Sequence, residues 1–175
     1  NDDNCLHLHR DMVRGVLLTT PAKLLNALLL LSREEVLDFA ARRGVVVIAA
    51  AGNEGSIGSS VITRHPVTVP VIAYDSQARP VNQSNLGASI GRRGLGAPGE
   101  KVTSLGSGGR LATFGGTSAA APFVSGAVAL LWSAFPAATA ARIRMAITQA
   151  SGRRRASVVP PLLDAWNAYQ TMKTA

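Results

Sequence analysis

The chain has 175 residues, of which 47% are hydrophobic and 17 are glycine. This length and apolar content suffice to bury the core of one domain, and they exclude a disordered chain. The formal net charge is +8, but the arginines are scattered with few aromatic residues between them, so the charge indicates a solvated surface and we expect no nucleic acid as partner. The single cysteine, Cys5, excludes a disulfide within the chain.

The first 31 residues carry weak signals. His7 and His9 lie close to two acidic residues, but without further ligands this pattern favours a frayed or partner-dependent segment over a metal site. Residues 16–31 are apolar around a Thr-Thr-Pro break, which predicts a short strand, a turn and an apolar helical piece. The apolar patch at 24–31 is too short to span a bilayer, so we expect no membrane as partner, and no residue pattern implies a cofactor.

A helix and a strand follow with clear boundaries. Ser32 and Glu35 form a capping box, and Gly44 follows a basic last turn, so the pattern predicts a helix over 33–43. Residues 45–51 are β-branched and then small, which predicts a central parallel strand. A polar turn, 52–55, ends this strand at its C-terminal end, where sites gather in open α/β sheets.

The middle of the chain is rich in strand and turn signals. Two β-rich pieces, 60–63 and 67–74, are limited in their pairing by Pro66 and Pro70. A loop-rich stretch, 75–96, which includes Asn85, leads to short strands near Val102 and over 111–114. No domain boundary interrupts this pattern.

The most apolar stretch begins at a glycine pair. No charged residue occurs from Ala119 to Phe135, which predicts a helix that is buried on all sides. Pro122 fits if the helix begins near Ser118, because its missing N–H then belongs to the first turn. The local pattern by itself favours Ser118 as the N-cap of this helix. The same position also suits a reactive alkoxide, because the helix dipole and free N–H groups stabilise negative charge there.

Two further helices are expected near the end of the chain. Thr139 is suited to cap a helix that continues to Ala150. Pro160 and Pro161 then predict the start of a last amphipathic helix, which would place Leu162, Trp166 and Tyr169 on one face.

Residues 116–122, Gly-Thr-Ser-Ala-Ala-Ala-Pro, resemble the Gly-Thr-Ser-x-Ala-x-Pro signature of the subtilisin-like serine proteases. The resemblance implies that Ser118 is the nucleophile of a serine endopeptidase. It also implies an α/β fold, a three-layer subtilisin-like parallel sheet flanked by helices. Residues 50–55, Ala-Ala-Gly-Asn-Glu-Gly, are a second match in family order.

The second match implies further roles by the same resemblance. Asn53 would donate to the oxyanion of the tetrahedral intermediate, together with the Ser118 backbone N–H. Ala50, Ala51 and Gly52 would wall the pocket for the substrate residue before the scissile bond, and Thr117 is counted with them as substrate-binding. Taken without Ser118, the pattern favours Asn53 as a turn residue that tolerates a left-handed conformation. The resemblance covers roughly residues 32–150.

The sequence departs from the family where a general base and its orienting acid are needed. The Asp-Ser/Thr-Gly and His-Gly-Thr motifs are not found, and His65 is followed by Pro66. Asp75 precedes Ser76 and Gln77 and falls after Asn53, so we do not assign it as the acid. The chain is therefore interpreted as one partial domain, 1–175, the C-terminal half of a catalytic domain that is inactive in isolation.

The partners implied are a peptide or protein substrate and the missing N-terminal half, which would lie before Asn1 or on another chain. A non-catalytic binding or structural module of the same family is the main alternative. A nucleotide-binding loop at Gly52, Gly55 and Gly58 is disfavoured, because the spacing differs and no helix pattern follows. An α/β-hydrolase elbow is disfavoured because Ala120 stands where that motif needs glycine.

Overall fold

A four-stranded parallel sheet forms the centre of the protein. The computed structural model describes residues 16–18, 33–151 and 157–174. Strands β1 (Val16–Leu18), β2 (Val46–Ala50), β3 (Thr68–Tyr74) and β4 (Leu95–Pro98) are hydrogen-bonded in that order. The register places Ile48 opposite Leu18 and Val69, and Ala73 opposite Ala97. Every residue of β3 is buried, as expected for a central parallel strand covered on both faces.

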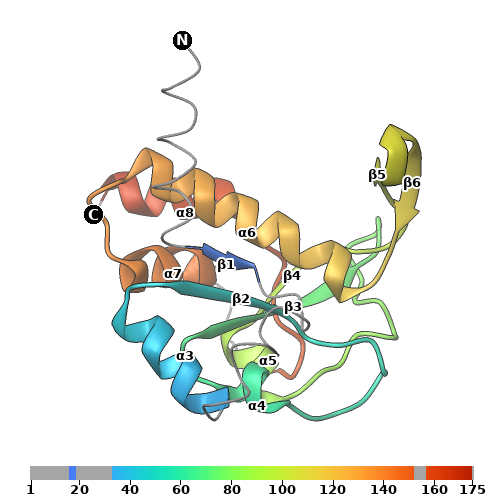
Figure 1. Ribbon diagram of the computed structural model, residues 1–175, viewed down its shortest axis with the longest axis horizontal. Helices are drawn as coiled ribbons and strands as arrows, with labels where there is room; N and C mark the ends of the chain where they lie inside the picture. Colours follow the sequence, from blue (N-terminus) through green and yellow to red (C-terminus); the bar gives the residue numbers. More distant parts are fainter. Residues whose placement is uncertain (1–15, 19–32, 152–156, 175) are drawn as a thin grey trace.

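Helices cover both faces of this sheet (Figure 1). Helices α3 (Arg33–Arg42), α4 (Val61–Arg64) and α5 (Ala88–Arg93) lie on one face, which Val47 and Ile72 point toward. Helices α6 (Thr117–Ala134), α7 (Ala140–Gln149) and α8 (Ala165–Thr174) lie on the other face. Successive residues of a strand point to opposite faces of the sheet. One apolar strand therefore contributes side chains to both cores.

The larger core lies between the sheet and α6. Fully buried side chains of the strands, such as Val71, meet Ala120, Val124 and Val128 of α6. These three positions are four residues apart, so they form one stripe along the helix. This stripe fixes α6 across the sheet and thereby places its N-terminus near the ends of β2 and β3.

A two-stranded hairpin extends from the body of the molecule. Strands β5 (Val102–Leu105) and β6 (Leu111–Phe114) pair antiparallel around a short 3₁₀ turn, Ser107–Gly109. Figure 1 shows this hairpin standing away from the sheet, just before the start of α6. Leu105 and Leu111 are exposed at its outer end.

The expected fold class is confirmed: a parallel sheet flanked by helices, in an incomplete domain. The strand predicted over 45–51 and the helix predicted over 33–43 are present as β2 and α3. The cap at Thr139 is also confirmed, since its Oγ1 accepts a 3.2 Å hydrogen bond from the Arg142 N–H.

Two expected elements are wrong. Residues 60–63 do not form a strand, because the Ser60 Oγ accepts from the Thr63 N–H and caps the short helix α4. The last helix begins at Ala165 rather than at the proline pair. Residues before it are extended, and Leu162 pairs with Gly96 along the edge of β4. The expectations for His7 and His9, for the cap at Ser32 and for the patch at 24–31 lie outside the described residues.

Helix α6 also differs from its expected burial on all sides. Its inner stripe is buried, but Phe123 and Leu130 on its outer face are 43% and 75% exposed. By length and composition alone, α6 is the one helix in the described part of the chain that could cross a membrane. One face of α6 is nonetheless packed on the sheet and α7, and the absence of a membrane partner stays a prediction.

Candidate active site

Two chain turns meet where β2 ends and α6 begins. The first turn, 52–55, follows β2 and contains two glycines with positive φ, Gly52 at 108° and Gly55 at 61°. The second turn leads from β6 through Gly115 and Gly116 into α6. Strands β2 and β3 are parallel, so this junction lies at the C-terminal ends of the strands. The sequence analysis predicts the site at the same end of the sheet.

Hydrogen bonds join Asn53 and Thr117 across this junction. The Asn53 Oδ1 accepts from the Thr117 backbone N–H at 2.9 Å, and the Gly52 N–H donates to the Thr117 Oγ1 at 3.2 Å. Since Oδ1 is committed to Thr117, the Nδ2 group is the donor that the Asn53 amide has left for another acceptor. Asn53 itself is exposed, so this donor is open to a ligand.

Ser118 lies beside this pair as the second residue of α6, and its side chain is exposed. It is not the N-cap, because Gly116 occupies that position and its carbonyl accepts from the N–H groups of Ala119 and Ala120. Within the described residues no acceptor takes the Ser118 N–H. The hydroxyl and this N–H therefore sit at the positive end of an 18-residue helix.

Pro122 lies two residues further into the helix than expected, because Gly116 and not Ser118 is the N-cap. The Ala120 N–H already bonds the Gly116 carbonyl, so the first turn is complete before Pro122 is reached. A residue at position 122 would normally donate to the carbonyl four residues earlier, which is that of Ser118. Proline has no N–H to donate, and the Ser118 carbonyl therefore loses its usual helical partner.

Gly116 is required by the approach of Asn53. Its φ is +84°, and a Cβ built on it would lie 2.8 Å from the Asn53 Oδ1 and 3.0 Å from the Nδ2. Its N–H donates to the Gly99 carbonyl at 2.7 Å, which ties this turn to the end of β4. The absence of a side chain at Gly116 therefore lets the amide of Asn53 reach the start of α6.

We expect Gly116→Ala to lower the free energy of unfolding by about 1–3 kcal/mol, because alanine is strained at positive φ and its Cβ displaces Asn53. Chemical denaturation measures this loss. Gly126→Ala is the matched control, since a Cβ at Gly126 in α6 meets nothing within 4 Å. Equal stability of Gly116→Ala and the parent chain would contradict the described contact.

The residues expected to wall a substrate pocket have different surroundings. Ala51 is buried in the core under α5, and Ala50 is half-buried at the end of β2. Gly52 is half-buried, and Thr117 is fully buried with its hydroxyl turned toward the Gly52 N–H. Thr117 thus has a clear role in holding the turn, and substrate contact by these four residues stays a prediction.

His65 is the only histidine among the described residues, and it is not near Ser118. It is buried at the end of α4, where its Nε2 lies 3.3 Å from the Asp38 Oδ1 on α3. It precedes β3 at the opposite end of the sheet from Asn53, and the ends of a seven-residue strand are roughly 20 Å apart. His65 therefore cannot take a proton from Ser118 in this arrangement.

Asp75 is engaged in a turn of its own at the end of β3. The N–H groups of Arg79 and Gln77 each donate to its Oδ1 at 2.9 Å, and the Arg79 Nε donates to Oδ2 at 2.8 Å. The Arg79 backbone N–H is the main cause that holds the pKa of Asp75 below its ordinary value, partly opposed by desolvation. The ionised Asp75 carboxylate thus stabilises its turn. This stabilisation is lost when the pH falls through the lowered pKa and the carboxylate takes up a proton.

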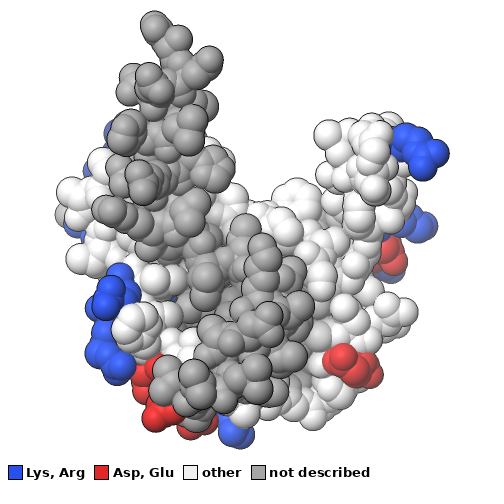
Figure 2. Space-filling view, viewed as in Figure 1, with Lys and Arg blue, Asp and Glu red and all other residues white. Residues whose placement is uncertain are grey.

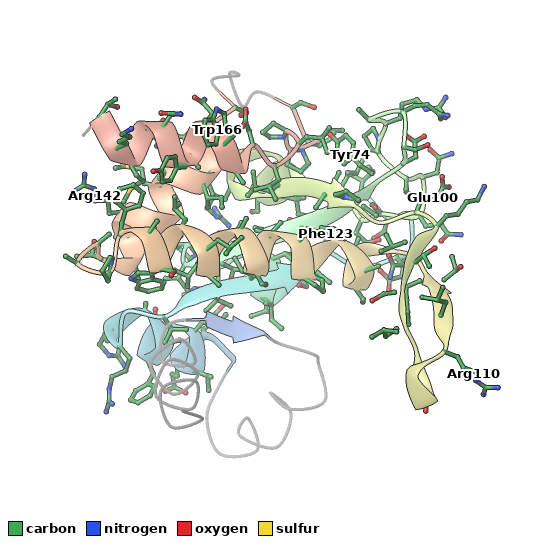
Figure 3. The ribbon with its side chains drawn as sticks, turned by 90° about the horizontal axis from the view of Figure 1, so that it is seen from above. Tyr74, Glu100, Arg110, Phe123, Arg142 and Trp166 are labelled. Carbon is green, nitrogen blue, oxygen red and sulfur yellow. The ribbon has the colours of Figure 1, made fainter. Side chains whose placement is uncertain are left out.

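A polar hollow of about 690 Å³ adjoins Asn53 on the side of this turn. Arg79, Glu100 and Lys101 line it together with Asp75 and Gly116. Figure 3 labels Glu100 near the base of the hairpin. No group of three or more His, Cys, Asp or Glu side chains in the described residues is placed to hold a metal ion.

Sequence reasoning missed one residue of this site. Asn85 was predicted only as part of a loop, but it lies beneath the turn that carries Asn53 and hydrogen-bonds that turn. An asparagine in a loop is common, and its partners are 29 to 34 residues away in sequence. No local pattern in the sequence signals such a contact.

A serine at a helix N-terminus and an asparagine amide at a strand end thus lie close together on a parallel sheet with helices on both faces. The sequence model of the Subtilase family matches residues 24–166. The chain belongs to this family.

Relatives of known sequence support this assignment. Subtilisin amylosacchariticus from Bacillus subtilis subsp. amylosacchariticus is 43% identical over 114 residues, which cover 62% of this chain and 29% of that protein. Subtilisin from Bacillus pumilus is 41% identical over 113 residues, covering 62% of this chain and 40% of that protein.

Solved structures agree with the sequence relatives. The self-cleaved protease domain of PatA is 29% identical, with a TM-score of 0.72, and the match covers 81% of this chain and 55% of that one. The prenylagaramide maturation protease PagA is 26% identical, with a TM-score of 0.70 over 78% of this chain and 53% of that one. The chain thus spans about half the length of these structural neighbours and less than half of the curated relatives.

Proposed function

We propose that this chain is the C-terminal half of a serine endopeptidase domain, in which Ser118 is the nucleophile and Asn53 completes the oxyanion hole. The observation that carries the proposal is the 2.9 Å hydrogen bond from the Thr117 N–H to the Asn53 Oδ1. This bond fixes the Asn53 amide so that its Nδ2 and the Ser118 N–H are two unpaired donors at the start of one helix.

These donors suit acyl transfer. The Ser118 Oγ would attack the carbonyl carbon of a peptide bond, and the negative charge that develops on the carbonyl oxygen would be stabilised by the Asn53 Nδ2 and the Ser118 N–H. Fixed donors of this kind contribute about 3–4 kcal/mol each to the transition state. Loss of the amine then leaves an acyl group on Ser118, and water releases it in a second step.

The proton of Ser118 requires a base from outside the described residues. His65 is remote and Asp75 is engaged by Arg79, so neither serves Ser118. We therefore propose that a front half with the Asp and His motifs supplies the base and its orienting acid, either upstream of Asn1 or on a separate chain. The term completed domain is used below for this chain together with such a front half.

An apolar groove of about 1130 Å³ runs along the outer face of α6 and begins at Ser118. Phe123 and Leu130 of α6, and Trp166 of α8, line it and are 43%, 75% and 70% exposed. Figure 3 labels Phe123 on α6 and Trp166 on α8. Exposed apolar side chains gathered along one groove are a common feature of protein interaction sites, which supports a partner here.

The occupant that fits this groove is the proposed front half. The structural neighbours are nearly twice as long as the matched part of this chain, so a comparable mass of protein would have to pack on it. A segment lying in the groove would reach Ser118, where the base is needed. Gly126 and Ala127 in the floor of the groove leave room for a closely packed backbone. On the face seen in Figure 2, the Lys and Arg side chains lie in separate groups rather than in one patch.

Hydrolysis of a fluorogenic peptide library tests the proposal. We expect purified 1–175 to show no Ser118-dependent turnover, because His65 is remote, Asp75 is engaged by Arg79, and the Asp-Ser/Thr-Gly and His-Gly-Thr motifs are not found in the sequence. The completed domain should cleave the library with multiple turnovers. Ser118-dependent turnover by 1–175 alone would overturn the need for a front half. A completed domain that binds peptides and cleaves none would favour the non-catalytic module.

A further inference from the structure

Asn85 holds the turn that carries Asn53. Its Oδ1 accepts from the backbone N–H groups of Glu54 at 3.0 Å and Ser56 at 3.1 Å. Its Nδ2 donates to the Ala51 carbonyl at 3.3 Å and also contacts the Glu54 carboxylate. The Asn85 backbone N–H donates to the Gly52 carbonyl at 3.0 Å. These bonds reach the turn on both sides of Asn53.

The Asn85 amide is fully used by this arrangement. An amide offers two N–H donors and two acceptor lone pairs, and all four have partners in the turn or at its start. Aspartate keeps the two accepted bonds but loses both donors and brings a second carboxylate beside Glu54. Glutamine is one methylene longer. The site is therefore specific for asparagine.

Gly52 is shaped to fit the same amide. A Cβ at Gly52 would lie 2.3 Å from the Asn85 Nδ2, and its φ of +108° is one that side chains rarely adopt. The turn thus closes around Asn85, and the direction of the chain entering Asn53 depends on it.

Asn85 is itself anchored to the sheet through its neighbour. Ser84 is buried, and its Oγ accepts from the Ala73 N–H of β3 at 3.1 Å. The Ser84 N–H donates to the Val81 carbonyl, and the Val81 N–H donates to the Ala73 carbonyl, both at 2.9 Å. Hydrogen bonds therefore tie Ser84 to the central strand β3, the peptide bond joins Ser84 to Asn85, and further hydrogen bonds lead from Asn85 to the turn of Asn53 and on to the start of α6.

We infer that Asn85 is a positioning residue for the oxyanion donor, and that it sets the Asn53 geometry within this chain alone, before any front half is present. A role of this geometry in catalysis rests on the proposed function, whereas the positioning of Asn53 by Asn85 does not. Every contact in the path joins described residues of the chain. The donor pair is accordingly preorganised, which is the property that makes such a site effective.

Amide NMR of the 1–175 chain tests the inference without any activity measurement. In Asn85→Ala we expect the Thr117 N–H to exchange with solvent about tenfold faster or more, as when several bonds that hold a loop are lost. The two Asn53 Nδ2 protons should change their chemical shifts, because the Oδ1 of the same amide loses its fixed hydrogen bond to the Thr117 N–H. The N–H groups of Val71 and Ile72 in β3 should keep their protection. Asn82→Ala, an exposed asparagine in the same segment, should change none of these signals.

Asn85→Asp decides the question if Asn85→Ala fails to fold, because it preserves size and the accepted bonds. We expect the same selective change at Thr117 and Asn53. Unchanged Thr117 and Asn53 signals would overturn the inference, and so would an equal rise in exchange at Val71, which would make Asn85 a general stabiliser. A change confined to the Thr117 and Asn53 signals, together with a completed domain that hydrolyses no peptide, would support the positioning role of Asn85 and contradict the proposed function.

Discussion

Ser118→Ala is expected to lower kcat of the completed domain by about 10⁶-fold, a magnitude established for the serine of a subtilisin and carried over to this chain. The physical reason is that alanine has no oxygen to form the acyl intermediate, while the two oxyanion donors remain. Steady-state hydrolysis of a fluorogenic peptide measures the loss. Residual catalysis from the remaining donors should still exceed the uncatalysed rate.

The control for this variant is another serine of the same helix. Ser133→Ala changes an exposed serine near the C-terminal end of α6, far from Asn53 along the helix axis, and should leave kcat within about twofold. Thermal unfolding should be similar for both variants, because Ser118 is exposed and caps no helix. Retained peptide hydrolysis in Ser118→Ala would show that another residue is the nucleophile.

Replacing Asn53 should lower kcat by about 10²- to 10³-fold with little change in KM, again a magnitude established for the asparagine donor of a subtilisin and carried over. The donor acts on charge that develops only in the transition state, so ground-state binding is largely unaffected. Asn53→Ala removes both the Nδ2 donor and the Oδ1 acceptor. Asn53→Asp keeps an acceptor for the Thr117 N–H, loses the donor and adds a negative charge.

The comparison of these two variants separates catalysis from folding. If the Nδ2 is the oxyanion donor, Asn53→Asp loses kcat at least as strongly as Asn53→Ala, while its thermal stability stays closer to that of the parent chain. If Asn53→Asp keeps nearly full kcat, the role of Asn53 is limited to the hydrogen bond with the Thr117 N–H. A rise in KM at constant kcat would place Asn53 in substrate binding instead.

Much of the fold was predictable because its signals are local. The β-branched run of β2 and the acidic first turn of α3 each specify an element within about ten residues. The pairing of Asn53 with Ser118 was predictable for a different reason, since two separate motifs of the family occur in order. The structure adds the hydrogen bond between Asn53 and Thr117, the neighbour of Ser118, and it places Gly116 rather than Ser118 at the cap position.

The features that could not be predicted depend on distant partners. The segment 60–63 has strand-forming residues, but the Ser60 cap and packing against α3 and β3 make it helical. Leu162 is drawn into an extended conformation by Gly96, so α8 starts later than its prolines suggest. The roles of Asn85 and the exposed outer face of α6 likewise follow from tertiary contacts that have no trace in the local sequence.

Labelling of Ser118 by a fluorophosphonate tests the central claim most directly, because this reagent reports an activated serine without requiring a known substrate. We predict that mass spectrometry of the completed domain finds the adduct on Ser118, at a rate that falls when Asn53 is replaced. The 1–175 chain alone should label far more slowly, since neither His65 nor Asp75 among its described residues can serve Ser118 as a base. An adduct on a different residue of the completed domain, or equal labelling of Ser118 in both proteins, would contradict this account.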